Sequence, residues 1–155
     1  MFAFNECVSL TEINIPSTIK SIGQFTFQNC DSLVSVYLPE NVGYINDGAF
    51  SDCDSLQEVT IANPDCWIFM GSGVIYNRTG DYSGDFYLYG GVIRGYEGSI
   101  AQEWAEGCGY TFVPLRDLNG KGTLSDPYQL GTLEDYQEFV YRVNSGNEPE
   151  ACAVL

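Results

Sequence analysis

The chain has 155 residues, which suits about one ordinary globular domain, and its 6 Lys and Arg against 21 Asp and Glu give a net charge of −15. Such a charge repels nucleic acid and anionic lipid surfaces, and the absence of His excludes Ser-His-Asp catalysis, Cys-His catalysis and most catalytic zinc sites. A hydrophobic fraction of 45% with 17 Gly and 6 Pro favours an all-β or repeat architecture.

A repeat of 23 residues runs through the first half of the chain. Its copies begin at Ala3, Thr26 and Ala49 and stay in register without a gap. Seven columns match in all three copies: Phe4/Phe27/Phe50, Cys7/Cys30/Cys53, Ser9/Ser32/Ser55, Leu10/Leu33/Leu56, Ile13/Val36/Val59, Ile15/Leu38/Ile61 and Ile22/Ile45/Ile68. Self-similarity at a fixed period of this length is typical of repeat proteins.

Each copy contains the run L-x-x-[IV]-x-[IL], whose alternation predicts a short strand with its aliphatic side facing inward. Pro16 and Pro39 end the first two strands. One copy alone cannot bury its apolar face, so the copies should stack on one another. The third copy has Ala62 in place of the proline, so we expect the repeat to end or distort from about Asn63.

The pattern AF-x-x-C-x-SL-x-x-[IV]-x-[IL]-P resembles the BspA-like leucine-rich repeats of surface proteins from host-associated bacteria and some protists. The resemblance implies a mainly β repeat solenoid, a leucine-rich-repeat-like right-handed coil with a short helix-containing closing segment. Its domain would span 1–115, with repeats 3–25, 26–48 and 49–71 and a closing segment 72–115. Thr18, Asn41 and Pro64 stand where such repeats usually carry Asn or Cys.

Residues 90–115 resemble the closing segment of this family, which is a strand, a short helix and a final strand. Ser99 is a predicted N-cap with Gln102 as its capping-box partner, and Gly107 or Gly109 would end the helix. Its apolar stripe would be Ile100, Trp104, Ala105 and Cys108. Upstream, GVIY and DFYLY flank a Gly- and Asp-rich stretch, which predicts a hairpin.

A change of composition follows the closing segment. The polar stretch 116–127 indicates a linker, and 128–155 indicates a small partial α+β piece. Thr132 and Asp135 predict a helix start, with an apolar face of Leu133, Tyr136, Phe139, Val140 and Val143. This piece resembles the module that precedes right-handed β-helices in bacterial surface proteins. Because both ends of the chain leave strand edges unpaired, we expect a fragment of a longer secreted protein.

Cys7, Cys30 and Cys53 share one column of the repeat, which favours buried thiols over a disulfide or metal framework. Disulfides or metal binding stay as the alternative, which would also draw on Cys66, Cys108 and Cys152, although no C-x-x-C spacing occurs.

Three other sequence motifs resemble functional sites, but each favours a structural interpretation. Residues 117–122 echo a calcium loop, but Lys121 and Tyr128 stand at ligand positions. Asn77 heads a glycosylation sequon, which matters only in a secreted eukaryotic protein. The aromatic cluster of Tyr82, Phe86, Tyr87 and Tyr89 suits sugar stacking or, more simply, hairpin packing.

Carboxylates are the remaining groups for catalysis. Glu12 and Glu58 occupy one repeat column with Ser35 between them, about 9–10 Å apart at ordinary strand spacing, a separation that suits the two sides of a glycosidic bond. Outward polar positions on strands are mostly solvated, so we interpret these two residues as surface positions and predict no enzyme activity.

The outward strand positions therefore form the predicted binding face, with Tyr37 as its anchor. Its residues are Tyr37, Asn14, Thr60, Glu12, Ser35 and Glu58. The resemblance implies a non-catalytic recognition or adhesion module at the cell surface, which binds an extracellular host protein or glycan without a cofactor. The alternatives are the non-catalytic front of a carbohydrate-active β-helix enzyme and a passive surface spacer. No stretch of the chain is long and apolar enough to predict membrane insertion, and the N-terminus has no signal-peptide pattern.

Overall fold

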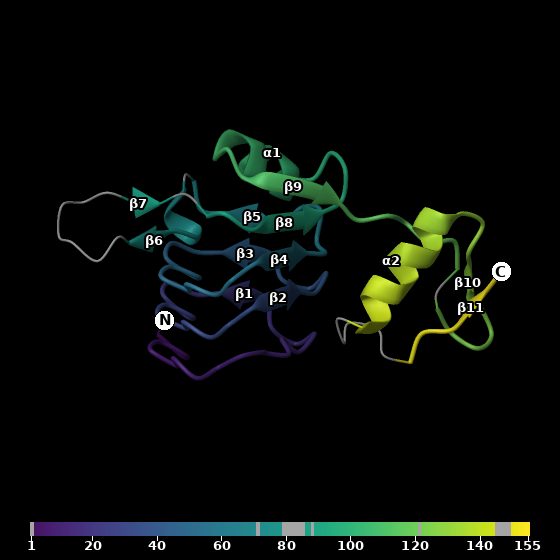
Figure 1. Ribbon diagram of the computed structural model, residues 1–155, viewed down its shortest axis with the longest axis horizontal. Helices are drawn as coiled ribbons and strands as arrows, with labels where there is room; N and C mark the ends of the chain where they lie inside the picture. The colour runs from purple at the N-terminus through teal and green to yellow at the C-terminus, as the bar shows by residue number, and fades with distance from the viewer. Residues whose placement is uncertain (1, 71, 79–85, 88, 121, 145–149) are drawn as a thin grey trace. The chain divides into compact units, whose positions relative to one another are not determined.

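The computed structural model describes residues 2–70, 72–78, 86–87, 89–120, 122–144 and 150–155 (Figure 1). The chain divides into two compact units, Met1–Pro114 and Leu115–Leu155. We refer to them as unit 1 and unit 2.

The larger sheet of unit 1 is parallel and has four strands. They are β2 (Ser35–Leu38), β4 (Glu58–Ile61), β8 (Val92–Gly95) and β9 (Thr111–Pro114), in the order β2-β4-β8-β9 (Figure 1). Asn14 extends the sheet through a parallel bridge to Tyr37. The predicted strand run of each copy thus pairs with the same run of the next copy.

A second parallel sheet joins β1 (Ser21–Ile22), β3 (Tyr44–Ile45) and β5 (Trp67–Ile68). Each residue pairs with the residue 23 positions later, so the period of the sequence is the period of the structure. The pairing continues through Ile68, so the expected break at Asn63 is wrong. The Asn63 side-chain amide donates a hydrogen bond to the Val42 carbonyl oxygen, 3.0 Å away, and holds the turn to the preceding copy.

Two left-handed backbone positions recur in the turn that opens each copy. Phe2, Phe25 and Gly48 have φ between 54° and 62°, and so do Glu6, Asn29 and Asp52, four residues later. This conformation costs non-glycine residues about 1 kcal/mol or more, so it persists only where the surroundings impose it. Here the turns bond to one another: Phe27 N–H donates to the Ala49 carbonyl oxygen at 2.9 Å.

The core of unit 1 is a stack of like side chains. The rings of Phe4 and Phe27 lie 5.3 Å apart and those of Phe27 and Phe50 5.4 Å apart, and both pairs are within 7° of parallel. Phe27 and Phe50 are buried, as are Leu33, which precedes β2, and the inward β2 residue Leu38. Full burial of each such side chain contributes about 1.5–3 kcal/mol, so this column supplies much of the stability of unit 1.

The closing segment has the predicted order of strand, helix and strand. Helix α1 (Ile100–Gly107) lies between β8 and β9 and begins at Ser99, whose hydroxyl accepts a hydrogen bond from Gln102 N–H at 3.3 Å. The predicted stripe is inward-facing, with Trp104 and Ala105 buried. Upstream, a 3₁₀ turn (Ser72–Val74) overlaps the stretch expected to be the first hairpin strand. A hairpin is present, but it pairs β6 (Asn77–Arg78), from the stretch expected to be the loop, with β7 (Phe86–Tyr87).

Unit 2 pairs β10 (Tyr128–Gln129) with β11 (Ala153–Val154) and contains helix α2 (Leu133–Asn144). Its small core is Leu118, Tyr128 and Leu130, with Phe139 packed against it. Leu118 comes from the stretch expected to be a linker. No helix within the described ranges is long and apolar enough to cross a bilayer.

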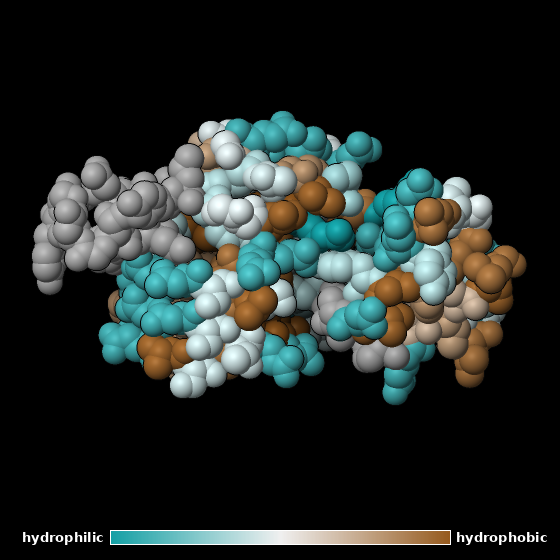
Figure 2. Space-filling view, in the orientation of Figure 1, coloured by the Kyte–Doolittle hydropathy of each residue, from teal (hydrophilic) through white to brown (hydrophobic). Residues whose placement is uncertain are grey.

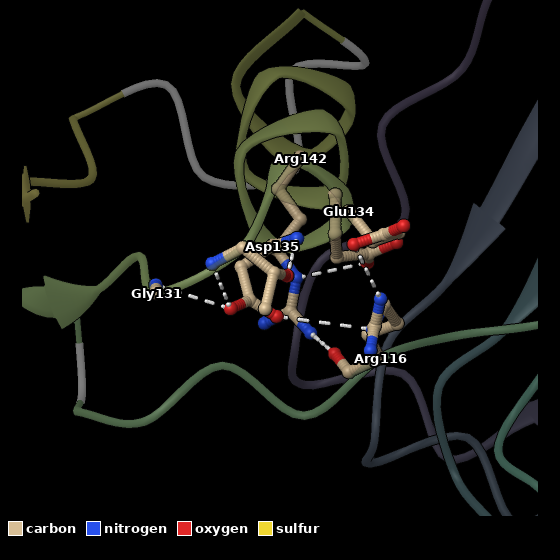
Figure 3. A network of polar contacts seen from close by, with 7 residues as sticks. Arg116, Gly131, Glu134, Asp135 and Arg142 are labelled. Atoms are coloured by element: carbon tan, nitrogen blue, oxygen red, sulfur yellow. Dashed lines mark hydrogen bonds and ion pairs between the residues drawn. The ribbon is translucent and has the colours of Figure 1, made fainter.

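The predicted apolar face of α2 is partly wrong, because Leu133 and Tyr136 are exposed. The helix instead buries Glu138, whose carboxylate lies 3.0 Å from Arg142 Nε, and the guanidinium of Arg142 lies over the Tyr128 ring. Figure 3 shows the polar network at this helix, in which Arg142 also donates to the Arg116 carbonyl oxygen. A paired charge therefore replaces the expected apolar contact.

Candidate binding surface

The outward positions of the four-stranded sheet form two rows across the strands. One row runs from Asn14 through Tyr37 and Thr60 to Arg94, each being the register partner of the next. The structure therefore places three of the predicted residues side by side. We call the outward side of this sheet the strand face.

The second row contains Ser35 and Glu58, which are register partners, and it continues to Val92. Ser35 is exposed and Glu58 is half-buried. Glu12 is exposed and occupies the corresponding position of the first copy. The register thus places Ser35 and Glu58 on the same side of the sheet.

Exposure differs along the first row. Asn14 is exposed and Tyr37 is half-buried, whereas Thr60 is only 1% exposed. The expectation that Thr60 offers an accessible contact is therefore wrong. Its short side chain lies in the row between Tyr37 and Arg94, and both neighbours are much larger.

The structure adds Arg94, which the sequence reasoning missed. Its Nε lies 3.2 Å from the Glu58 carboxylate, and the two side chains are only 19% and 28% exposed. Arg94 stands in β8, after the last repeat, so no equivalent residue in an earlier copy marked it. The alternation in V-I-R-G, with Ile93 fully buried, is the signal that places Arg94 outward.

This ion pair bears on the carboxylates considered for catalysis. The Glu58 carboxylate is engaged by Arg94, while Glu12 is exposed on the first copy. The two carboxylates therefore have different surroundings, one exposed to solvent and one held in an ion pair.

The six cysteines are free thiols, and those in the repeat column lie in the core. Cys30 and Cys53 are buried, and Cys7, on the first copy, is half-buried. Burial raises the pKa of Cys53 to about 12, and burial alone raises the pKa of Cys66 to about 12. At neutral pH these side chains are therefore neutral and act as small hydrophobic groups.

The aromatic residues of the hairpin are only partly described. Tyr82 lies outside the described residues, as do the side chains of Phe86 and Tyr87. Tyr89 is buried, and its ring meets that of Tyr110 edge to face at 5.7 Å. This contact supports the packing interpretation for Tyr89 over sugar stacking.

Two further sequence motifs extend beyond the described residues. Asn77 lies in β6, but Thr79, the third residue of its sequon, is outside them. The stretch resembling a calcium loop includes Lys121, which is also outside them.

On the side of unit 1 seen in Figure 2, hydrophobic side chains lie in separate patches among hydrophilic ones.

A comparison with family models identifies the repeat. Residues 1–77 match the model described as BspA type leucine rich repeat region, with 6 copies. This match covers the three copies, the sheet of β1, β3 and β5, strands β2 and β4 of the larger sheet, and the stacked Phe column. Residues 1–77 are a BspA-type leucine-rich repeat region.

The BspA-type family is commonly a surface or adhesion module, is generally non-catalytic and suggests protein binding. Its members are typically found at the cell surface or secreted. No curated protein and no solved structure matches the chain.

Proposed function

We propose that unit 1 is a non-catalytic recognition module with the shape of a repeat solenoid, and that its strand face binds an extracellular protein at the cell surface. The BspA-type repeat supports the general class. The arrangement of residues on the strand face supports the choice of surface.

The observation that carries this proposal is the position of Tyr37 on the strand face. Its ring is half-buried and stands between exposed Asn14 and buried Thr60, with exposed Ser35 on the same strand. A fixed tyrosine has little entropy to lose on binding and offers a large contact area and a hydroxyl. Small polar neighbours leave a partner room to approach the ring.

The ion pair of Glu58 and Arg94 forms the charged border of this surface. Because both side chains are about three-quarters covered or more, the pair is held in place before a partner arrives. Partly buried pairs of this kind contribute mainly to specificity, since a partner must satisfy or avoid a fixed charge arrangement. We therefore expect Arg94 to influence partner choice more than affinity.

The size of the strand face limits what it binds alone. Four strands of four residues cover roughly 250 Å² at ordinary strand spacings, whereas a standard interface buries about 800 Å² on each partner. A protein partner therefore reaches from the strand face onto the neighbouring turns, while a short peptide or glycan fits within it. A protein contacts a larger area than a glycan does. This larger area favours a protein as the ligand that binds stably.

Surface plasmon resonance on a panel of extracellular-matrix proteins, beside a printed glycan array, tests the proposal. The variants are Tyr37→Ala and Tyr136→Ala, the latter removing an exposed tyrosine from unit 2. We expect saturable binding to a protein, weakened at least about tenfold by Tyr37→Ala and unchanged by Tyr136→Ala. Equal binding by both variants, or no binding to any panel member, contradicts the proposal.

A further inference from the structure

Three large aromatic side chains lie exposed beside the smaller parallel sheet of unit 1. Tyr44 is 58% exposed, Trp67 is 42% exposed and Phe69 is 37% exposed. Tyr44 and Trp67 are register partners on β3 and β5, and Phe69 follows directly after β5. Single exposed apolar residues are common, but three adjoining rings on a folded surface indicate an interaction site.

The three rings meet at angles and do not form one flat platform. The centroids of Tyr44 and Trp67 lie 6.1 Å apart with a tilt of 48°, and those of Trp67 and Phe69 lie 6.5 Å apart at 83°. A sugar ring stacks best along a flat aromatic surface. Angled rings instead form a corner, so a cation that enters it approaches the electron-rich faces of more than one ring.

The charge around this corner favours a cationic ligand. Residues 1–77 contain nine acidic side chains and one basic side chain, Lys20. Exposed Asp65 stands two residues before Trp67, and half-buried Asp47 stands three residues after Tyr44. Lys20 lies on the first copy, where its carbonyl oxygen accepts from the N–H of Gly43. The summed electrostatic field of these charged side chains attracts positively charged ligands.

The same charge argues against other occupants. A second copy of the chain also carries −15, so two copies repel each other at low ionic strength. An anionic glycan or lipid surface is repelled for the same reason. A basic protein segment gains from both the charge and the aromatic rings.

We infer that Tyr44, Trp67 and Phe69 form a second binding surface, which accepts a Lys or Arg side chain from a basic segment of a partner protein. This surface uses none of the residues of the strand face, so it does not rest on the proposed function. Together the two surfaces would give unit 1 two separate contacts.

Two-dimensional NMR of the whole chain tests this inference. The protein has two tryptophans, so the indole N–H signal of exposed Trp67 reports on the corner while that of buried Trp104 is an internal control. The probes are a capped peptide of alternating glycine and arginine, the same peptide with neutral citrulline in place of arginine, and cellohexaose. Trp67→Phe, Trp67→Leu and Tyr44→Leu are the test variants, and Tyr136→Leu, which removes an exposed ring from unit 2, is the control.

We expect the arginine peptide to shift the Trp67 signal saturably and leave that of Trp104 in place, with the citrulline peptide binding at least about threefold more weakly. Followed through the neighbouring amide signals, Trp67→Leu and Tyr44→Leu each weaken binding about threefold and Trp67→Phe weakens it less, while the Tyr136→Leu control binds like the wild type. Thermal melts establish that each variant is folded, and Trp67→Phe preserves an aromatic ring if Trp67→Leu is unstable.

Four results would overturn the inference. Equal binding of the arginine and citrulline peptides excludes a role for the cation, and unchanged binding in the test variants indicates diffuse charge attraction. A stronger Trp67 shift with cellohexaose indicates a glycan surface. A Trp67 shift that depends on protein concentration alone indicates self-association. Loss of strand-face binding in Tyr37→Ala leaves this experiment unaffected, so the two proposals fail separately.

Discussion

The thiol of Cys53 donates a hydrogen bond to the carbonyl oxygen of Phe27 in the preceding copy, with sulfur and oxygen 3.0 Å apart. Cys30 makes the same bond to Phe4 at 3.1 Å. The two most regular columns of the repeat are thus joined: phenylalanine rings stack along the core, and each thiol satisfies a backbone carbonyl of the copy before it. A small, weakly polar side chain suits this position because it fills the core and also donates.

Cys53→Ala should lower the free energy of unfolding of unit 1 by about 1–2 kcal/mol, because it opens a small cavity and leaves the Phe27 carbonyl oxygen without this donor. Denaturant unfolding followed by tryptophan fluorescence measures this, since both tryptophans lie in unit 1. Cys152→Ala in unit 2 is the control and should change the value by less than about 0.5 kcal/mol. Equal effects of the two variants would refute the structural role of Cys53.

Burial should make the core thiols slow to react and should weaken unit 1 at high pH. Burial raises the pKa of Cys53 and of Cys66 to about 12 from an ordinary value of 9.0. The neutral thiol is favoured in the folded state, so this stabilisation is fully present below pH 9 and is lost as the pH rises from about 9 towards about 12.

Two measurements check this prediction. An aromatic disulfide reagent at pH 8 should modify Cys152 rapidly and Cys53 and Cys66 only on unfolding. The fall in unfolding free energy above pH 9 should be shallower in the Cys66→Ala variant. Rapid modification of Cys53 in the folded protein, or a disulfide bond between Cys53 and Cys30, would show that the cysteine column is not protected by burial.

Gly48→Ala should destabilise unit 1 by about 2 kcal/mol or more. Gly48 has φ +62°, and a Cβ atom there would lie within van der Waals overlap of the Phe25 ring. Gly107→Ala is the matched control, because it lies at the end of α1 with no neighbouring atom within 4 Å of the added Cβ. The control should be neutral or slightly stabilising. Melting temperatures compare the two, and similar values would contradict the tight turn.

The cap of helix α2 should weaken in acid. The Asp135 carboxylate accepts from Thr132 N–H at 3.0 Å and from Gly131 N–H at 3.1 Å (Figure 3). The hydrogen bond with the Thr132 side chain is the main cause that lowers the pKa of Asp135 below its ordinary 3.8. A lowered pKa gives stability that is present above 3.8 and lost as the pH falls through the folded value.

NMR titration of the Gly131 and Thr132 amide signals measures this change. Both signals should move together with a midpoint below 3.8, and Asp135→Asn should remove the transition. A midpoint at or above 3.8 would show that the carboxylate does not hold the cap.

Local and periodic features were predictable from the sequence. The burial of Val36 and Leu38 follows from alternation within the strand, and the caps at Ser99 and Thr132 follow from side chains three residues from the N–H groups they satisfy. Such features depend on neighbours in the chain or on equivalent positions one period away.

Features set by contacts between dissimilar elements were not predictable. Arg94 meets Glu58 across β8 and β4, outside the repeat, and Arg142 makes the burial of Glu138 possible on α2. The exposed pair of Tyr44 and Trp67 was missed because the first copy carries Ser21 at that position, so the column shows no shared residue type. The alternation of the strand placed Thr60 on the correct side of the sheet, but the burial of its side chain depends on the neighbouring side chains.

Hydrogen–deuterium exchange of the chain, alone and bound to a protein from the extracellular-matrix panel, tests the central claim most directly. If the strand face binds the partner, backbone amides of 12–14 and 35–37 should exchange more slowly in the complex, while those of α2 should be unchanged. Protection confined to other segments, or a panel in which no protein binds saturably, would contradict the assignment of the strand face as the binding surface.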